Sequence, residues 1–251
     1  MTTTDQIDHA TRFGEQRVAE EEKARLVRDV FDSVASRYDL MNDLMSAGVH
    51  RLWKREMVEL VARDVGKGRV VDVAGGTGDI AFRLLERGFT VEIVDINASM
   101  LAVGRDRAYD RALTDGLTWT CGDAEALPLP SSSVDAYTIA FGIRNVTHLD
   151  TALTEARRVL RPGGRFSCLE FGHVVLPQLA EVYERYSDSV LPRLGELVTG
   201  DRESYQYLVE SIRRFPQQER FAAMVGEAGM VHVATRNLSG GIAALTTAWR
   251  L

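Results

Sequence analysis

A glycine-rich loop, Asp72-Val73-Ala74-Gly75-Gly76-Thr77-Gly78, carries the clearest binding chemistry in the sequence. Glycine lets a ligand approach the backbone closely, where a side chain would block it. The helix expected to begin near Asp79 presents unpaired N–H groups, which favour a negative ligand group. The loop therefore predicts that Asp72, Gly75, Gly76, Thr77 and Gly78 hold the polar end of a cofactor. A dinucleotide site or a plain tight turn has the same local pattern.

Two later aspartates stand at spacings that suit a nucleoside. Asp95 ends the apolar run 90–95, where a carboxylate can accept hydrogen bonds from both hydroxyls of a ribose. Asp123 follows the run 117–121, where a carboxylate can accept a hydrogen bond from an adenine amino group. The alternatives are a turn-forming aspartate beside a helix start for Asp95 and a solvated loop charge for Asp123.

Arg144 and Asn145 follow another strand-like run, at the edge where open α/β sheets bind ligands. A guanidinium stays protonated, so Arg144 would stabilise a developing anion rather than take a proton itself. Its alternative role is a structural ion pair with a loop carboxylate. His148 and His50 are alternative bases, because histidine ordinarily titrates near neutrality, and His173 could line the pocket. The position of His50 on an expected helix favours a non-catalytic role.

Seven strand-like runs alternate with helical patterns. The expected strands are Arg69–Ala74, Thr90–Asp95, Leu117–Cys121, Val134–Phe141, Arg165–Phe171, Val231–Arg236 and Ile242–Trp249. The expected helices between them cover 79–87, 99–112, 151–160 and 218–228. Strands that alternate with helices of this length predict right-handed crossovers and a mostly parallel sheet.

The remaining segments predict additions to this α/β core. The boundaries are 1–12 for a disordered tail, 13–64 for a helical cap and 65–251 for the core, with a helical insertion at about 174–216. Within the cap, helices are expected over 14–34 and 49–63. Within the insertion, a helix over 174–191 is expected to precede a polar stretch that reaches Phe215.

The bulk composition of the 251 residues excludes several classes of protein. A formal net charge of -6 argues against a general nucleic-acid-binding protein, because neutralising phosphates requires clustered Lys and Arg. The two cysteines, Cys121 and Cys168, have neither disulfide nor metal-ligand spacing, and no metal site is expected. The sequence has no apolar stretch of the roughly 18–20 residues that a membrane span needs, and no signal or transit peptide pattern. We expect a cytoplasmic protein that can contact the inner face of the membrane peripherally.

These motifs together resemble the class I methyltransferases. The matching segments are Asp72–Gly78, Asp95, Gly122-Asp123-Ala124, Leu127-Pro128 and Arg158–Gly164. The resemblance implies a Rossmann-like fold with a mostly parallel seven-stranded sheet and helices on both faces. It also implies S-adenosyl-L-methionine as cofactor, S-adenosyl-L-homocysteine as product, and cofactor contacts from Ile96, Ala124 and Ala140. Many members have Gly at the position of Ala74, a departure small enough that we expect little change.

A closer resemblance lies outside that core. Segments that resemble the quinone-biosynthesis C-methyltransferases are Tyr38–Ser46 with His50 and Trp53, Phe141–Val146, Val190–Arg193, Ser204-Tyr205, Tyr207-Leu208 and Glu210–Ile212. The match runs from about Phe13 to the C-terminus. These enzymes methylate a ring carbon of demethylmenaquinol or of a methoxy-polyprenyl-benzoquinol.

That family resemblance implies roles at an acceptor site. A quinol ring carbon becomes nucleophilic when a neighbouring hydroxyl loses its proton. The resemblance implies that Arg144 polarises a water that takes this proton, with Asn145 and Tyr38 completing the hydrogen-bond network. Residues expected to contact the substrate are Met41, Met45, Trp53 and His148, although plain helix packing is the alternative for the apolar ones. Lys54 and Arg55 would face anionic headgroups or simply solvent.

The expected partners are a polyprenyl quinol, other quinone-biosynthesis enzymes and a second copy of the chain in a homodimer. Three other functions remain open. They are a methyltransferase for another phenolic or lipid-like acceptor, a noncatalytic cofactor-binding accessory protein, and a nicotinamide dehydrogenase. The spacing of the glycines and Asp123 argue against the dehydrogenase.

Overall fold

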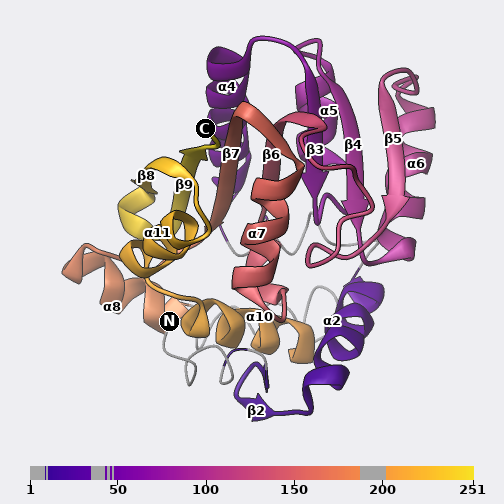
Figure 1. The fold of residues 1–251 in the computed structure, drawn as a ribbon. Coiled ribbons are helices and arrows are strands. Elements are labelled where there is room, and N and C mark those ends of the chain that lie inside the picture. Colours follow the sequence, from indigo (N-terminus) through magenta and orange to yellow (C-terminus); the bar gives the residue numbers. More distant parts are fainter. Residues whose placement is uncertain (1–8, 10, 35–42, 44–45, 47, 187–201) are drawn as a thin grey trace.

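A seven-stranded sheet forms the centre of the computed structural model, which describes residues 9, 11–34, 43, 46, 48–186 and 202–251 (Figure 1). Across the sheet the strands run in the order β5-β4-β3-β6-β7-β9-β8. Their bounds are β3 (Arg69–Val73), β4 (Thr90–Asp95), β5 (Leu117–Cys121), β6 (Val134–Ala140), β7 (Leu160–Phe171), β8 (Val231–Leu238) and β9 (Ala243–Trp249). β9 is antiparallel to both neighbours, and the other pairs are parallel. The predicted fold class is confirmed.

Helices cover both faces of the sheet (Figure 1). Their bounds are α2 (Glu20–Val34), α4 (His50–Val65), α5 (Asp79–Leu85), α6 (Ala98–Asp110), α7 (Leu149–Val159), α8 (Pro177–Arg185), α10 (Arg202–Arg214) and α11 (Gln218–Glu227). Two short 3₁₀ helices, η2 (Ile143–Asn145) and η4 (Ser239–Gly241), follow β6 and β8. One apolar core packs α4 and α5 against the sheet, and a second packs α7 and α11 against the opposite face.

The sequence pattern accounts for these layers. β3 is buried at four of its five positions, as expected of a central parallel strand that is covered on both faces. The buried residues of α7 recur at helical spacing, so the helix turns one apolar stripe toward the sheet. They are Leu149, Ala152, Leu153, Ala156 and Val159.

The N-terminal cap differs from its prediction. Residues 12–17 form a small hairpin of β1 (Arg12–Phe13) and β2 (Gln16–Arg17), and the helix begins only at Glu20. Gly14 has a φ of 57°, a conformation that suits glycine in a turn. Phe13 then stacks on Tyr207 with ring centroids 4.3 Å apart, so a packed aromatic pair holds the hairpin. His9 and Arg12, in the predicted disordered tail, are described, whereas residues 1–8 and 10 lie outside the described part.

The late insertion also differs. The polar stretch before Phe215, for which no separate helix was predicted within the helical insertion, contains α10, whose Tyr205, Leu208 and Ile212 are buried at helical spacing. The helix expected over 174–191 is described as α8, over Pro177–Arg185, and residues 187–201 lie outside the described part. The division into tail, cap and core remains a prediction.

Candidate functional site

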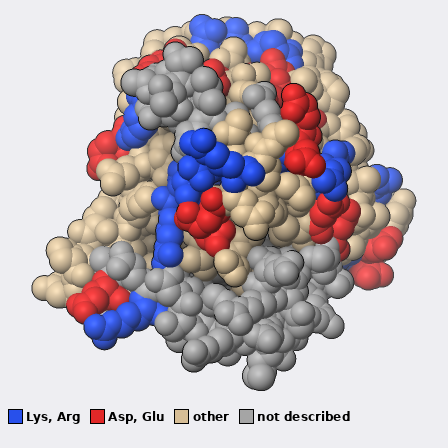
Figure 2. All heavy atoms as spheres, turned by 90° about the horizontal axis from the view of Figure 1, so that it is seen from below, with Lys and Arg blue, Asp and Glu red and all other residues tan. Residues whose placement is uncertain are grey.

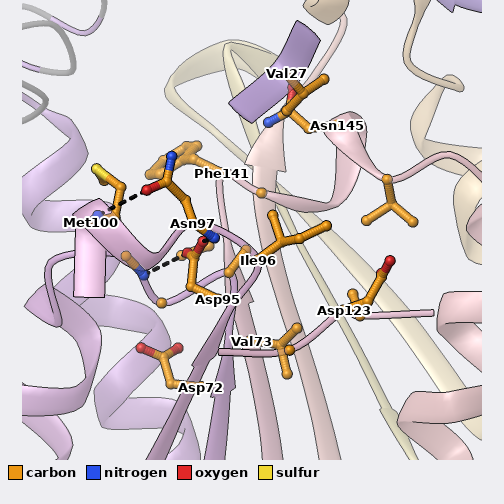
Figure 3. A pocket seen from close by; sticks show the side chains of 18 of the residues that line it. Val27, Asp72, Val73, Asp95, Ile96, Asn97, Met100, Asp123, Phe141 and Asn145 are labelled. Carbon is orange, nitrogen blue, oxygen red and sulfur yellow. Dashed lines mark hydrogen bonds between the residues drawn. The ribbon is translucent and has the colours of Figure 1, made fainter. Parts of the chain in front are cut away.

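A cavity of about 1090 Å³, open to solvent, lies where β3, β4, β5 and β6 end (Figure 3). It is lined by every residue predicted to bind the cofactor except Gly78. These are Asp72, Gly75, Gly76, Thr77, Asp95, Ile96, Asp123, Ala124 and Ala140. The topology thus brings together loops that are up to seventy residues apart in the sequence, because parallel strands end at the same edge of a sheet.

The glycine loop turns sharply between β3 and α5. Gly76 has a φ of 52°, and a Cβ on Gly75 would lie 2.8 Å from the side chain of Ile93. Gly78 lies outside the cavity lining and instead ends the turn, with a φ of 85° at the N-terminus of α5. The expectation of a ligand contact at Gly78 is therefore replaced by a role in shaping the backbone.

Ala74 also adopts a left-handed conformation, with a φ of 50°. A residue with a Cβ is strained there, whereas glycine would not be. Alanine at this position, where many family members have glycine, therefore strains the backbone. The small size of alanine had predicted little effect.

Asp72 places one unsatisfied oxygen at the cavity. Its carboxylate is buried, and Oδ1 accepts a hydrogen bond of 2.8 Å from Thr138 Oγ1. Oδ2 has no hydrogen-bond partner in the part of the chain that the structure describes. Burial raises the pKa of Asp72 to about 7, against the opposing effects of Thr138 and Lys54. A cationic donor from a ligand would satisfy Oδ2 and favour the ionised form.

Asp95 is held by the loop that it faces. Oδ2 accepts a hydrogen bond of 2.9 Å from Gly76 N, and Oδ1 accepts one of 2.8 Å from Asn97 N (Figure 3). Burial raises its pKa to about 6, and these two backbone donors act in the opposite direction. Each carboxylate oxygen retains a second lone pair, so Asp95 can accept hydrogen bonds from two neighbouring ligand hydroxyls.

Asp123 and its neighbours form a polar edge beside an apolar surface. Asp123 Oδ1 accepts a hydrogen bond of 2.9 Å from Glu125 N, which orients the carboxylate at the cavity. Ile96 and Ala124 line the same region. A flat heteroaromatic ring with an amino group fits such a surface.

Lys54 and Asp79 line the cavity as well and were not predicted to do so. Lys54 is buried, and its Nζ lies 2.8 Å from Asp79 Oδ2, which corrects the expectation that Lys54 faces headgroups or solvent. Burial alone would raise the pKa of Asp79, but the charges of Lys54 and Arg83 lower it to about 2. Helical periodicity offered a signal, because Lys54 shares the face of α4 that carries the buried Met57, Val58 and Val61.

The helix α2 forms another wall. Val27 and Arg28 line the cavity, and Asn97 Nδ2 donates a hydrogen bond of 2.9 Å to Asp32 Oδ1 of the same helix. Asn97 also caps α6 by accepting a hydrogen bond from Met100 N. One asparagine thus joins the N-terminal cap to the loop after β4, a contact that sequence pattern alone does not indicate.

Arg144 and Asn145, two of the three residues predicted to be catalytic, are neighbours in η2 but differ in their surroundings. Asn145 lines the cavity, and its Oδ1 accepts a hydrogen bond of 2.9 Å from the hydroxyl of Tyr207. Arg144 does not line this cavity. Its Nη1 lies 2.8 Å from Glu170 Oε1 and 2.6 Å from Phe141 O. Arg144 thus forms an ion pair, which was its alternative role, although the carboxylate of Glu170 lies on β7 rather than on a loop.

Three other predicted site residues, Tyr38, Met41 and Met45, lie outside the described residues. The catalytic arrangement of Arg144, Asn145 and Tyr38 therefore remains a prediction.

Trp53 lies in the apolar core and not in the cavity lining, which differs from the prediction that it contacts substrate. It is 4% exposed, packs against Phe141 and Phe171, and donates a hydrogen bond of 3.0 Å to Ser239 Oγ. The next residue in the sequence, Lys54, lines the cavity instead.

None of His50, His148 and His173 lines the cavity, although Glu125, the partner of His148, does. His148 Nδ1 lies 2.6 Å from Glu125 Oε2, and His173 Nε2 lies 2.8 Å from Phe215 O. His50 is buried beside Ser46 Oγ, and burial lowers its pKa to about 4, in keeping with its expected non-catalytic role.

The described residues contain neither a metal-binding cluster nor a helix that could span a membrane. No group of three or more His, Cys, Asp or Glu side chains among them is placed to hold a metal ion. No helix among them is both long enough and apolar enough to cross a membrane.

Several solved structures with a similar fold are named as methyltransferases. An S-adenosylmethionine-dependent methyltransferase from Aquifex aeolicus superposes with a TM-score of 0.58 at 14% identity, covering 79% of this chain and 89% of that one. Phosphoethanolamine N-methyltransferase 2 from Haemonchus contortus, solved with S-adenosyl-L-methionine, gives 0.56 at 16% identity, covering 78% of this chain and 52% of that one. At such identities the likeness shows the fold alone.

Sequence relatives are much closer. The ubiquinone/menaquinone biosynthesis C-methyltransferase UbiE of Brucella canis is 57% identical over 243 residues, which cover 95% of this chain and 90% of the relative. The same enzyme of Brucella anthropi is 56% identical and covers 95% and 92%. The model of the ubiE/COQ5 methyltransferase family matches residues 16–250. The resemblance inferred from Tyr38–Trp53 and Phe141–Val146 is thereby confirmed, and the chain belongs to the ubiE/COQ5 methyltransferase family.

Proposed function

We propose that the chain transfers a methyl group from S-adenosyl-L-methionine to a ring carbon of a polyprenyl quinol, in the biosynthesis of menaquinone, ubiquinone or both. The names of its relatives support the reaction class and the pathway. The observation that carries the proposal is the unpartnered, buried Oδ2 of Asp72 at one end of a cavity whose other walls carry Asp95 and Asp123.

These carboxylates fit the three polar parts of the cofactor. Asp72 Oδ2 would accept a hydrogen bond from the ammonium of the methionine part. Asp95 would accept hydrogen bonds from the ribose hydroxyls, and Asp123 from the adenine amino group. Once bound, the cofactor supplies a sulfonium methyl group that is already electrophilic, so the protein's task is to orient the acceptor and exclude water.

The acceptor side of the cavity lies toward η2. Asn145 is fixed there by Tyr207, and Phe141 and Val27 offer apolar surface beside it. The oxygen of a ring hydroxyl that has lost its proton would be stabilised by accepting a hydrogen bond from Nδ2 of Asn145. This amide nitrogen is the free end of the side chain, because Tyr207 donates to Oδ1. Arg144, directly before Asn145, would add positive potential, although Glu170 offsets part of its charge.

The setting of the reaction follows from the substrate. A polyprenyl quinol resides in membranes, so we propose a cytoplasmic protein that works at the inner face of the membrane. We also propose contacts with other enzymes of quinone biosynthesis and a homodimer.

Quinone profiling tests this function. We expect a bacterium that lacks the gene to accumulate demethylmenaquinone, a demethylated ubiquinone precursor, or both, as measured by mass spectrometry. Expression of the chain should restore the mature quinone, and the Asp95→Ala variant should not. An unchanged quinone profile in the deletion strain would overturn the proposed acceptor and leave another phenolic or lipid-like acceptor to be sought.

A further inference from the structure

A second cavity, of about 1040 Å³, lies beside the first and is lined largely by cations. Its lining residues are all described and are His9, Arg12, Gly14, Lys23, Arg144, Tyr207, Ser211, Arg213, Arg214, Pro216 and Arg220. Six of them are Lys or Arg, and none is Asp or Glu, in a chain whose net charge is -6. Figure 2 looks at the lower face of Figure 1, on the side of α10 and α2, where Lys and Arg side chains gather in a connected band.

The two cavities share one wall. Arg144 lines the second cavity, while its neighbours Asn145 and Val146 line the first. Two residues of the second cavity hold this wall by hydrogen bonds. Tyr207 donates to Asn145 Oδ1 at 2.9 Å, and Lys23 Nζ donates to Val146 O at 3.2 Å.

Carboxylates outside the lining pair with several of these cations. Glu170 pairs with Arg144, Glu15 with Arg214, and Glu227 with Arg220. Lys23 is different, because it is 2% exposed and its two hydrogen bonds go to the neutral carbonyl oxygens of His9 and Val146. A buried cation without a bonded anion is costly.

Two donors remain for a ligand. The ammonium of Lys23 has three N–H groups, and its two hydrogen bonds leave one. The Nε of Arg214 is buried and has no hydrogen-bond partner in the described part of the chain. Burial lowers the pKa of Lys23 to about 8, against the opposing charge of Glu125.

We propose that this second cavity binds a phosphate-bearing anion. A phosphate presents several acceptor oxygens and a charge that can be shared among converging guanidinium and ammonium groups, which arginine and lysine bind strongly. The anion would satisfy Arg214 Nε and the third N–H of Lys23. This proposal does not depend on the methyl acceptor, since it concerns a cavity on the other side of the wall from the cofactor site.

Titration calorimetry with inorganic diphosphate tests the site. We expect binding that weakens as salt is added, and a loss of roughly tenfold in affinity for Arg220→Gln, which removes one lining charge from the rim. Arg185→Gln is the matched control. It removes the same charge from a Glu-paired arginine of α8 and should change the affinity by less than about twofold. Binding of S-adenosyl-L-homocysteine, measured on the same samples, reports the cofactor site separately and confirms that both variants are folded.

Vesicles distinguish the source of the phosphate. If phosphatidylglycerol vesicles, but not phosphatidylcholine vesicles, retain the protein and diphosphate displaces it, the phosphate is that of a lipid headgroup. If diphosphate binds and the vesicles do not, the ligand is a free phosphorylated molecule. Either result supports the site. No binding of either probe, or equal weakening by Arg220→Gln and Arg185→Gln, would overturn the proposal.

Discussion

The Cβ of Ala74 occupies the space that a side chain on Gly142 would need. A Cβ built on Gly142 lies 2.4 Å from Ala74 Cβ, whereas the nearest other atom, of Ile139, is 3.6 Å away. Gly142 has a φ of -121°, which any residue can adopt, so the restriction to glycine there comes from Ala74 and not from the backbone. The alanine in the cofactor loop and the glycine after β6 therefore form a matched, contacting pair in the cavity wall.

This pair predicts non-additive stabilities. Gly142→Ala should lower the free energy of unfolding by about 1–3 kcal/mol through overpacking. Ala74→Gly should be neutral or stabilising by up to about 1 kcal/mol, because it removes a left-handed alanine but adds a flexible glycine to the unfolded chain. The double variant should recover most of the loss, since the two Cβ atoms no longer meet. Urea unfolding of all four proteins measures the coupling, and simple additivity would show that the two positions do not interact.

Asp72→Asn tests the unpartnered oxygen. The amide can keep the hydrogen bond from Thr138, but it offers no charge to a ligand ammonium. Affinity for S-adenosyl-L-homocysteine should fall roughly ten- to one-hundredfold, the range for a lost hydrogen bond to a charged group. Thr138→Val is the control, because it leaves the Asp72 charge in place and should weaken binding less. Equal affinities of the Asn variant and the parent protein would place the ammonium elsewhere.

The raised pKa of Asp72 predicts that both the stability of the fold and the binding of the cofactor depend on pH. The carboxylate titrates at about 7 in the folded chain without ligand and near its ordinary value of 3.8 when unfolded. A folded-state pKa above the unfolded value means that the folded chain binds the extra proton. The contribution of Asp72 to stability is therefore greatest below about pH 4 and is lost as the pH rises through 7.

Ligand binding should have the opposite trend, because the ammonium needs the ionised carboxylate. We expect the affinity for S-adenosyl-L-homocysteine to rise between pH 5.5 and 8, with a contribution from Asp95, whose pKa is about 6. Calorimetry over this range should give a steeper rise for the parent protein than for Asp72→Asn. Identical slopes would contradict the assignment to Asp72.

Removing the hydrogen bond between Tyr207 and Asn145 should lower the rate of methyl transfer without lowering the affinity for the cofactor. Tyr207→Phe removes the hydrogen bond to Asn145 Oδ1 and frees the amide to rotate. We expect kcat to fall about tenfold, while the affinity for S-adenosyl-L-homocysteine stays within about twofold. Tyr137→Phe is a matched control, because that tyrosine is also buried and its hydroxyl has no hydrogen-bond partner among the described residues. A kcat that is reduced equally by both substitutions would indicate a general effect of removing a buried hydroxyl.

Much of the sheet could be predicted from the sequence because its signals are local. The bounds of β4 and β5 match their prediction, since in each case a strand-like run lies between turn residues. The hairpin of β1 and β2 was missed because two-residue strands have no periodicity. α10 was missed because its many polar residues obscured the apolar stripe that Tyr205, Leu208 and Ile212 form.

The cofactor side of the site was predicted better than its surroundings. Asp72 and Asp95 lie at the carboxyl ends of β3 and β4, and Asp123 follows β5, so topology alone brings them to one edge. Lys54, Asn97 and Tyr207 come from separate elements, and their contacts with the cavity or its wall depend on tertiary packing. Trp53 is the opposite case. Its place in a specific motif predicted a contact with the substrate, but its side chain is buried in the core.

Transfer of an isotopically labelled methyl group tests the central claim most directly. The purified chain would be incubated with methyl-labelled S-adenosyl-L-methionine and a short-chain demethylmenaquinol or methoxy-benzoquinol, and the product analysed by mass spectrometry and NMR. We predict one labelled methyl group on a ring carbon and an equal amount of S-adenosyl-L-homocysteine. A methyl group on oxygen, or no turnover of either quinol by a chain that binds the cofactor, would contradict the account.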